Sequence, residues 1–305
     1  MVGTTVSNRA AVIETPRVSA PAIVVDSTSY LPAELIERHQ MQVVSLYVGL
    51  EGDQERESEI TDLDAFYERL RASGETVTTS QPSVGDFLDV YEPLLADGRE
   101  IVSLHLSAGI SGTYESALQA RERLSNDGKG GERITVFDSR TAAGGFGLVI
   151  LAAADAASDG GSVEQVVSRA ERARDSVKVW YAVDTLEFLR RGGRIGAARA
   201  LIGSTLKIKP ILTFEEEVTP VERVRTKSRA RERLVDYARQ RHESGADAWV
   251  VQHIQEPEVA EKMVEECRPI FGREPAYVSE LGPVLGAHAG PGLLGVGGME
   301  TSLLS

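Results

Sequence analysis

The chain has 305 residues, enough for two domains of ordinary size, because single hydrophobic cores rarely extend beyond about 250–300 residues. Its 33 Lys and Arg against 46 Asp and Glu give a formal charge of −13, which repels nucleic-acid backbones and argues against such a partner. The single cysteine, Cys267, excludes an intrachain disulfide and a metal site built from several cysteines.

Targeting and membrane signals are weak. No stretch approaches the ~20 apolar residues of a membrane span, and the first residues lack the apolar run of a signal peptide. We therefore expect a cytoplasmic protein without stable membrane insertion. Residues 1–20 mix small and polar residues without a helical or strand period, and they are predicted to form a flexible leader.

Hydrophobic runs alternate with helical patterns from residue 22 onward. The first predicted elements are a strand over 22–25, a helix over 33–39 begun by Pro32, a strand over 43–50, an acidic surface segment over 51–59, a helix capped by Thr61 or Asp62, and a helix over 84–96. Ser83 and Asp86 predict a capping box for the last helix, because the hydroxyl can accept from an unpaired backbone N–H.

The same alternation continues to residue 157. The next predicted elements are a strand over 101–106, a helix over 111–124, a strand over 134–137 and an alanine-rich helix over 141–157. Strict alternation of strand and helix favours a parallel sheet covered on both faces. We therefore predict an N-terminal, doubly wound α/β domain over residues 21–177.

The pattern changes after about Val177. The predicted elements there are a strand over 179–183, short helices flanking 191–193, a hairpin that begins at Ile211, helices over 228–242 and 257–271, and a strand over 248–252 between them. This mixture favours a C-terminal α+β domain over residues 178–305, so the whole chain is predicted to be a two-domain α/β protein.

Five segments rich in Ser, Thr or Gly lie at the connections between a predicted strand and the helix that follows it. They are 26–29, 79–83, 107–113, 138–145 and 282–292. In an open parallel sheet the carboxyl ends of the strands form the ligand crevice, and a helix start there offers unpaired N–H groups. Hydroxyl and amide groups aimed at one spot suit a small anionic head group, such as a carboxylate or phosphate.

Two residues in these segments carry most of the chemistry. Ser111 alone would be an N-cap that serves only its helix, but the hydroxyls of Thr79 and Ser80 on a second loop of the same type favour ligand contact. His288 stands in a loop among glycines and prolines, where it could donate to a carboxyl oxygen and stabilise charge that develops in phosphoryl transfer.

The motifs resemble those of the DegV family, the fatty-acid-binding subunits of bacterial fatty acid kinase. The resemblance is carried, in order, by Asp26-Ser-Thr-Ser-Tyr-Leu-Pro32, Thr79-Ser-Gln-Pro-Ser83, Ser111-Gly-Thr-Tyr114, Leu186-Glu-Phe-Leu-Arg-Arg-Gly-Gly-Arg-Ile195, Lys207-Ile-Lys-Pro-Ile-Leu212 and Gly282-Pro-Val-Leu-Gly-Ala-His-Ala-Gly-Pro-Gly292. The ordered set spans nearly the whole chain and is specific, although each motif alone is weak.

The resemblance implies a long-chain fatty acid held in a tunnel between the two domains, with no other cofactor. The implied carboxyl-binding set is Thr79, Ser80, Ser111, Gly112, Thr113 and His288. In that family the binding subunit does no chemistry alone. A separate ATP-dependent kinase subunit phosphorylates the presented carboxyl group, and the acyl phosphate goes toward phospholipid synthesis.

The chain departs from the family pattern around the histidine. Ala287 and Ala289 stand where the family often carries Thr, which leaves His288 without neighbouring hydroxyls to orient its imidazole.

Arg190, Arg191 and Arg194 form a cationic cluster in an acidic protein, and we predict that it contacts the partner or a phosphate. A solvated helix end with favourable dipole contacts is an equal alternative for these arginines.

Two enzymatic alternatives stay open. Ser111, Asp138 and His288 follow in the chain order of a serine hydrolase triad, although Thr113 stands where the nucleophile elbow requires a final glycine. Such an enzyme would act on a small or lipid ester. A nucleotide-binding kinase is the third possibility, but the chain lacks the Gly-rich phosphate-binding motifs of such enzymes. No His, Cys and carboxylate spacing predicts a metal site.

Overall fold

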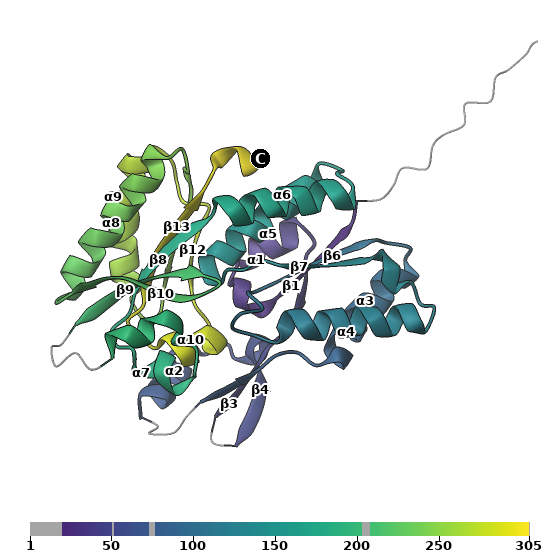
Figure 1. Ribbon diagram of the computed structural model, residues 1–305, viewed down its shortest axis with the longest axis horizontal. Coiled ribbons are helices and arrows are strands. Elements are labelled where there is room, and N and C mark those ends of the chain that lie inside the picture. The colour runs from purple at the N-terminus through teal and green to yellow at the C-terminus, as the bar shows by residue number, and fades with distance from the viewer. Residues whose placement is uncertain (1–19, 51, 73–76, 203–207, 305) are drawn as a thin grey trace, which may run out of the picture.

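A computed structural model describes residues 20–50, 52–72, 77–202 and 208–304. The described chain forms two larger β-sheets, a small third sheet and the helices that cover them (Figure 1). The predicted leader therefore lies outside the described residues, apart from Ala20. Within the described part of the chain, no helix is both long enough and apolar enough to cross a membrane.

The first sheet has four parallel strands in the order β2-β1-β6-β7. Their bounds are β1 Ala22–Asp26, β2 Gln42–Val44, β6 Ile101–His105 and β7 Ile134–Asp138. Side chains alternate between the two faces of a strand. Ala22 and Val24 face the helices α3 and α4, whereas Ile23 and Val25 face α5 and α6. The prediction of a parallel sheet covered on both faces is confirmed.

The helices around this sheet follow the predicted alternation. Their bounds are α1 Ala33–Arg38, α3 Val84–Ala96, α4 Thr113–Asn126, α5 Ala143–Ser158 and α6 Val163–Ser176. The capping box of Ser83 and Asp86 is present at the start of α3. Helix α6, which was not predicted from the sequence, follows α5 closely and packs against it.

The second sheet has six strands in the order β10-β9-β8-β13-β11-β12. Their bounds are β8 Lys178–Ala182, β9 Lys209–Glu215, β10 Glu217–Val224, β11 Ala248–His253, β12 Tyr277–Glu280 and β13 Leu294–Met299. Only the β11–β12 pair is parallel. The helices α8 Lys227–Glu243 and α9 Pro257–Phe271 cover the face that carries Trp249 and Val251. The predicted hairpin and the two long helices are confirmed.

Helix α5 joins the two sheets. It packs against β1 of the first sheet and against β11 and β13 of the second, on the face that carries Ala248 and Val250 (Figure 1). Nearly every residue of α5 is buried, and its Ala and Gly side chains are small enough to let both sheets approach closely. The space that remains between the sheets beside the start of α5 becomes the functional cavity.

One sequence prediction near residue 50 was wrong, and a second fails at a single residue. The strand predicted over 43–50 is broken at Ser45 and Leu46, where the chain leaves the first sheet and enters the antiparallel sheet β4-β3-β5. Its strands are β3 Tyr47–Leu50, β4 Asp53–Arg56 and β5 Thr78–Ser80. The hydroxyl of Ser27 accepts from the Leu46 N–H and so fixes the change of sheet.

The acidic segment over 51–59 was predicted to lie on the surface, and residues 52, 54–56, 58 and 59 are exposed, but Glu57 of the short helix η2 Glu57–Glu59 is buried. Buried donors around this carboxylate, described below, explain how it leaves solvent. The next helix, α2, spans Leu63–Ala72, and Asp62 accepts from the Ala65 N–H at its start.

The segment 282–292 was predicted to be a loop, but it contains the helix α10 Pro283–Ala289. Proline at the first helical position is favourable, because its missing N–H would be unpaired there anyway. The remaining short helices are η1 Ser27–Ser29, η3 Gly131–Arg133, α7 Glu187–Arg191, η4 Gly196–Leu201 and η5 Thr301–Leu303.

Candidate functional site

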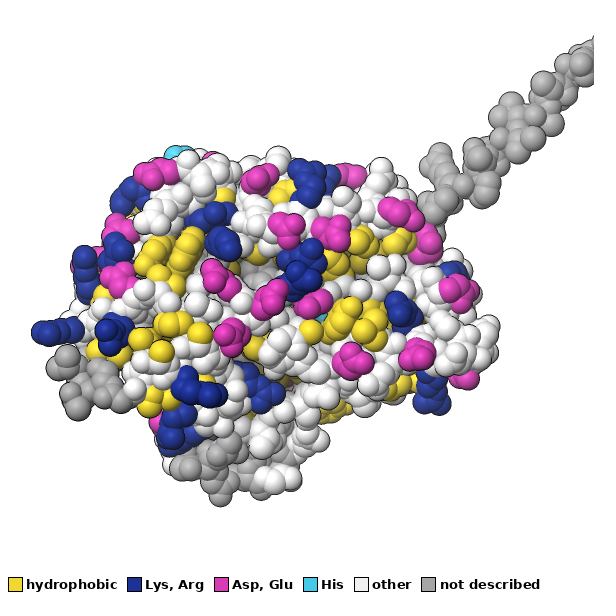
Figure 2. Space-filling model, viewed as in Figure 1, with side chains coloured by type: hydrophobic (Ala, Val, Ile, Leu, Met, Phe, Trp, Pro, Cys, Tyr) yellow, Lys and Arg dark blue, Asp and Glu magenta, His cyan; other side chains and the backbone are white. Residues whose placement is uncertain are grey.

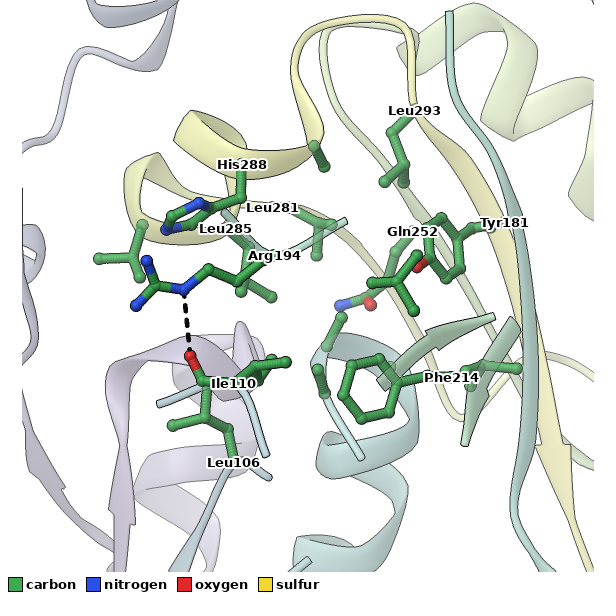
Figure 3. A pocket seen from close by; sticks show the side chains of 18 of the residues that line it. Leu106, Ile110, Tyr181, Arg194, Phe214, Gln252, Leu281, Leu285, His288 and Leu293 are labelled. Atoms are coloured by element: carbon green, nitrogen blue, oxygen red, sulfur yellow. Dashed lines mark hydrogen bonds between the residues drawn. The ribbon is translucent and has the colours of Figure 1, made fainter. Parts of the chain in front are cut away.

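A cavity of about 1040 Å³, including its mouth, lies between the first-sheet loops, the start of α5, the second sheet and α10 (Figure 3). Most of the wall is aliphatic. The apolar lining includes Leu46, Leu106, Ile110, Val179, Leu189, Phe214, Val218, Val250, Leu281, Val284, Leu285 and Leu293.

Polar side chains gather at one side of this cavity. Thr79 comes from β5 and His288 from α10, and Thr79 Oγ1 lies 2.8 Å from His288 Nε2. Ser80 and Ser111 line the same cavity. Thr79, Ser111 and His288 are far apart in the sequence, so the fold itself brings them to one cavity, whereas the Ser80 hydroxyl accepts from the Gln54 side chain. We call Thr79, Ser80, Ser111 and His288 the polar end of the cavity.

The imidazole of His288 is held in its neutral form. Burial, with a smaller contribution from the nearby Arg194 charge, lowers the pKa of His288 to about 4. Its Nδ1 is buried and has no hydrogen-bond partner among the residues that the structure describes. Gly192 packs against this atom, because a Cβ added there would lie 2.1 Å from Nδ1. Thr79 therefore contacts the imidazole ring on one side, and the backbone of Gly192 packs against it on the other.

The residues of the 111–113 segment lie in two places, one at the cavity wall and two at the start of a helix. Helix α4 begins at Thr113 with Gly112 as its N-cap, two residues later than predicted. Ser111 lines the cavity, and its Oγ lies 2.9 Å from Thr113 Oγ1. Gly112 and Thr113 are not among the residues of the cavity wall, and Thr113 is fully buried. Thr113 contacts Ser111, and Gly112 packs against the side-chain amide of Gln81, so a ligand contact of either residue stays a prediction.

The three arginines of the predicted cationic cluster, Arg190, Arg191 and Arg194, do not lie at one site. Arg194 lines the cavity and donates to the Ile110 carbonyl at 3.3 Å (Figure 3). It also donates to the Gly192 carbonyl at 2.8 Å. Arg190 and Arg191 are absent from the cavity wall, and both form ion pairs with Glu187 on the same exposed helix. Of these three arginines, only Arg194 places positive charge beside the polar end. Over the face drawn in Figure 2, acidic and basic side chains are interspersed rather than gathered by sign.

The hydrolase triad considered from the sequence is not assembled. Ser111 pairs with Thr113, and His288 pairs with Thr79. Asp138 accepts from the backbone N–H groups of residues 108 and 140 instead of orienting the imidazole. A nucleophile needs a base within hydrogen-bond reach and a third group that orients the base. Ser111, Asp138 and His288 do not meet this requirement.

A serine, a histidine and an aspartate do connect elsewhere, in the core of the first sheet. Ser103 Oγ lies 2.8 Å from His105 Nε2, and His105 Nδ1 lies 3.2 Å from Asp26 Oδ2. All three side chains are completely buried, and Tyr91 donates to Ser103. No substrate can reach this network, so it serves to satisfy polar groups inside the sheet.

Helix α10 is anchored at its start by a buried carboxylate. Glu57 accepts from the Tyr30 hydroxyl at 2.6 Å, from the Ser27 hydroxyl at 2.5 Å and from the Val284 N–H at 2.8 Å. Burial is the largest cause of the raised pKa of Glu57. Because α10 also carries His288, this anchor fixes the position of the polar end.

Sequence reasoning missed three polar residues of the wall: Gln81, Tyr181 and Gln252. Gln81 lies inside the Thr-Ser-Gln-Pro motif, and its amide packs against the backbone of Gly112, so the motif itself held the signal. Tyr181 and Gln252 lie on strands of the second sheet, where only strand pairing decides which face a side chain takes.

Comparison with protein families identifies a match over most of the chain. A family model described as an uncharacterised protein of the DegV family matches residues 21–301. A DegV domain-containing protein of Streptomyces coelicolor is 40% identical over 278 residues, which cover 90% of this chain and 96% of the relative. Protein DegV of Bacillus subtilis is 36% identical over 278 residues, with coverage of 90% and 97%.

Solved structures are also similar. A structure from Thermus thermophilus, reported as fatty acid binding of a DegV family protein, has a TM-score of 0.82 and 34% identity, covering 92% of this chain and 99% of its own. The structure of DegV from Bacillus subtilis, described as a fatty acid binding protein, has a TM-score of 0.82 and 34% identity, with coverage of 92% and 100%.

Proposed function

Because the chain belongs to the DegV family, we propose that it binds one long-chain fatty acid in the cavity between its two sheets. The observation that carries the proposal is the character of this cavity, which has mostly aliphatic walls and a group of hydroxyls with an imidazole at one side. The fatty acid binding reported for relatives in Thermus thermophilus and Bacillus subtilis supports the same ligand class.

The apolar walls supply most of the affinity in this proposal. Each methylene group removed from water stabilises the complex by about 0.8 kcal/mol, so an acyl chain binds without many polar contacts. The polar end then fixes the orientation of the ligand. The carboxyl group is bound by Thr79, Ser80, Ser111 and His288. The positive charge of Arg194 favours the ionised form of this carboxyl group.

Mass spectrometry of an organic extract of the purified protein tests the ligand directly. We expect a long-chain fatty acid at about one molecule per chain. The Ser111→Ala variant should bind added stearic acid at least about tenfold more weakly, because a hydrogen bond to a charged group is lost. Ser83→Ala is the matched control, since Ser83 caps α3 and does not line the cavity. An empty protein that takes up no added fatty acid contradicts the proposal.

The finer part of the proposal concerns the fate of the ligand. We infer that the protein presents the carboxyl group to a separate ATP-dependent kinase subunit, which forms the acyl phosphate. The absence of an assembled triad at Ser111 and His288 supports a role as a binding subunit. The exposed Arg190 and Arg191 lie on α7, which packs against α10, and we propose that they contact this kinase.

Acyl phosphate formation with ATP and the purified kinase subunit, measured by trapping with hydroxylamine, tests this step. The chain alone should give no product. Charge reversal of Arg190 and Arg191 to Glu should lower the rate with the kinase but leave the dissociation constant of stearic acid unchanged, because neither residue lines the cavity. An unchanged rate would assign both arginines to a solvated helix end.

A further inference from the structure

The cavity has a second polar region, away from the polar end. Tyr181 on β8 and Gln252 on β11 both line the wall, and Gly295 of β13 lies between them, paired with each. Figure 3 shows the two side chains together, on the side of the cavity opposite His288 and Arg194. Gly295 has no side chain, and a Cβ added there would lie 3.2 Å from Tyr181 Cβ, so its absence leaves room beside the Tyr181 side chain.

The polar atoms of this region are oriented but unpaired. Gln252 is 5% exposed, and its Nε2 donates to Ser279 Oγ at 3.0 Å, which fixes the amide so that Oε1 is the free atom. Within the described ranges, neither this oxygen nor the Tyr181 hydroxyl has a hydrogen-bond partner. Burial raises the pKa of Tyr181, so its hydroxyl keeps its proton and can donate.

The start of α5 adds backbone donors to the same region. Ala143 and Gly144 line the cavity, and the N-cap Ala142 makes no side-chain hydrogen bond. A Cβ added to Gly144 would lie 2.9 Å from Gln252 Oε1, so the helix start and the free amide oxygen are neighbours. The first N–H groups of a helix have no partner within it and favour an oxygen atom.

We propose that Tyr181, Gln252 and the start of α5 bind a hydroxyl group carried on the acyl chain, so that the preferred ligand is a hydroxylated long-chain fatty acid. This inference rests on the proposed function and names its substrate class more closely. We call these residues the hydroxyl site.

The chemistry of the site selects a hydroxyl over other groups. A hydroxyl can donate to Gln252 Oε1 and accept from the Tyr181 hydroxyl at the same time. A carbonyl or carboxylate on the chain can only accept, and it would face the amide oxygen without a proton between them. A methylene leaves both protein groups out of water and unpaired, and a site built to bond a hydroxyl discriminates against a ligand that lacks it.

Isothermal titration calorimetry, on protein from which bound lipid has been removed, tests the inference. The probes are stearic acid and three hydroxystearic acids, with the hydroxyl near the carboxyl group, in mid-chain or near the methyl end. We expect one hydroxy isomer to bind about tenfold more tightly than stearic acid, the effect of one satisfied hydrogen bond. Tyr181→Phe and Gln252→Leu should each abolish this preference while stearic acid binds at least as tightly as before.

Tyr114→Phe is the matched control, because it removes a tyrosine hydroxyl outside the cavity and should preserve the preference. If stearic acid binds but no hydroxy isomer binds more tightly, the inference is overturned while the proposed function stands. If no probe binds at all, the proposed function fails as well. A preference that survives both Tyr181→Phe and Gln252→Leu overturns the assignment of the hydroxyl site.

Discussion

The position of the His288 imidazole depends on a residue without a side chain. Gly192 has φ −74° and ψ −6°, which alanine adopts easily, but its added Cβ would lie 2.1 Å from His288 Nδ1. Gly192→Ala should therefore displace the ring from Thr79 and weaken stearic acid binding by about tenfold, measured by titration. Gly85→Ala is the control, since its Cβ would meet its nearest neighbour at an ordinary 3.4 Å. Equal affinities for both variants would contradict the predicted role of Gly192.

Burial of His288 also predicts a pH dependence of folding. Its pKa is about 4 in the folded protein, against an ordinary value of about 6.5 in the unfolded chain. The unfolded chain therefore takes up the proton first, so the contribution to stability is present above pH 6.5 and is lost as the pH falls to about 4. We expect a loss of about 2–3 kcal/mol in the free energy of unfolding across this window.

Urea unfolding at a series of pH values measures this loss. The His288→Gln variant should show a correspondingly smaller decline between pH 6.5 and 4, because its amide does not titrate. A variant with the same decline as the parent would show that other groups carry the pH dependence.

At the residue scale, the sequence identified the hydroxyls and the imidazole but not all of their neighbours. Thr79, Ser111 and His288 stand in motifs rich in Gly, Ser and Thr, and all three line one cavity. Thr113 was placed in the binding set because it belongs to the same Ser-Gly-Thr motif as Ser111, but its side chain is fully buried at the start of α4. The direction of a side chain at a helix start changes when the helix begins one or two residues earlier or later. A sequence motif does not locate the start of a helix that finely.

At the element scale, α10 is the part of the site that needs the most support, because it has only seven residues. Glu57 ties its first turn to Tyr30 and Ser27. Removing the carboxylate in Glu57→Ala leaves these buried donors unpaired and should lower the free energy of unfolding by about 3 kcal/mol. Stearic acid affinity should fall too, since His288 lies on the same helix.

Chemical denaturation and titration of Glu57→Ala test both effects. Glu59→Ala is the matched control, an exposed glutamate in the same short helix, and it should change stability by less than about 0.5 kcal/mol. A Glu57→Ala protein as stable as Glu59→Ala would show that α10 is held by its apolar contacts alone.

The elements that the sequence misplaced share one physical cause. The strand over 43–50 looked continuous because its residues are apolar, yet a bond to Ser27 bends the chain at Leu46 into another sheet. Glu57 looked like a surface residue because charged residues seldom leave water. Its burial depends on donors that are distant in the sequence, which local patterns do not contain.

At the scale of the whole molecule, alternation of strand and helix was enough to predict the parallel sheet, because each crossover is encoded locally. The sharing of α5 between two sheets was not predictable in the same way. Its alanine residues predicted a helix but not its burial, and only the pairing of β11 with β13 places the second sheet on its other side. The cavity exists because of that arrangement, and so its walls could not be derived from local sequence.

A ligand that contacts both sheets should stabilise the molecule as a unit. Residues of the first-sheet loops, such as Leu106, and residues of the second sheet, such as Val250, line the same cavity. Stearic acid at a hundred times its dissociation constant should raise the free energy of unfolding by about 2.7 kcal/mol, provided that the unfolded chain does not bind it. Calorimetry should then show a single transition that moves up by several degrees.

Methyl stearate separates the contribution of the carboxyl group from that of the chain. It keeps every methylene but cannot present a charged oxygen to Ser111 and His288, so at the same concentration it should give a smaller rise in melting temperature. In Ser111→Ala the difference in melting temperature between the acid complex and the ester complex should shrink, because one hydrogen bond to the carboxylate is lost. An acid and an ester that stabilise the parent protein equally would mean that the polar end does not hold the carboxyl group, and that the acyl chain alone determines binding.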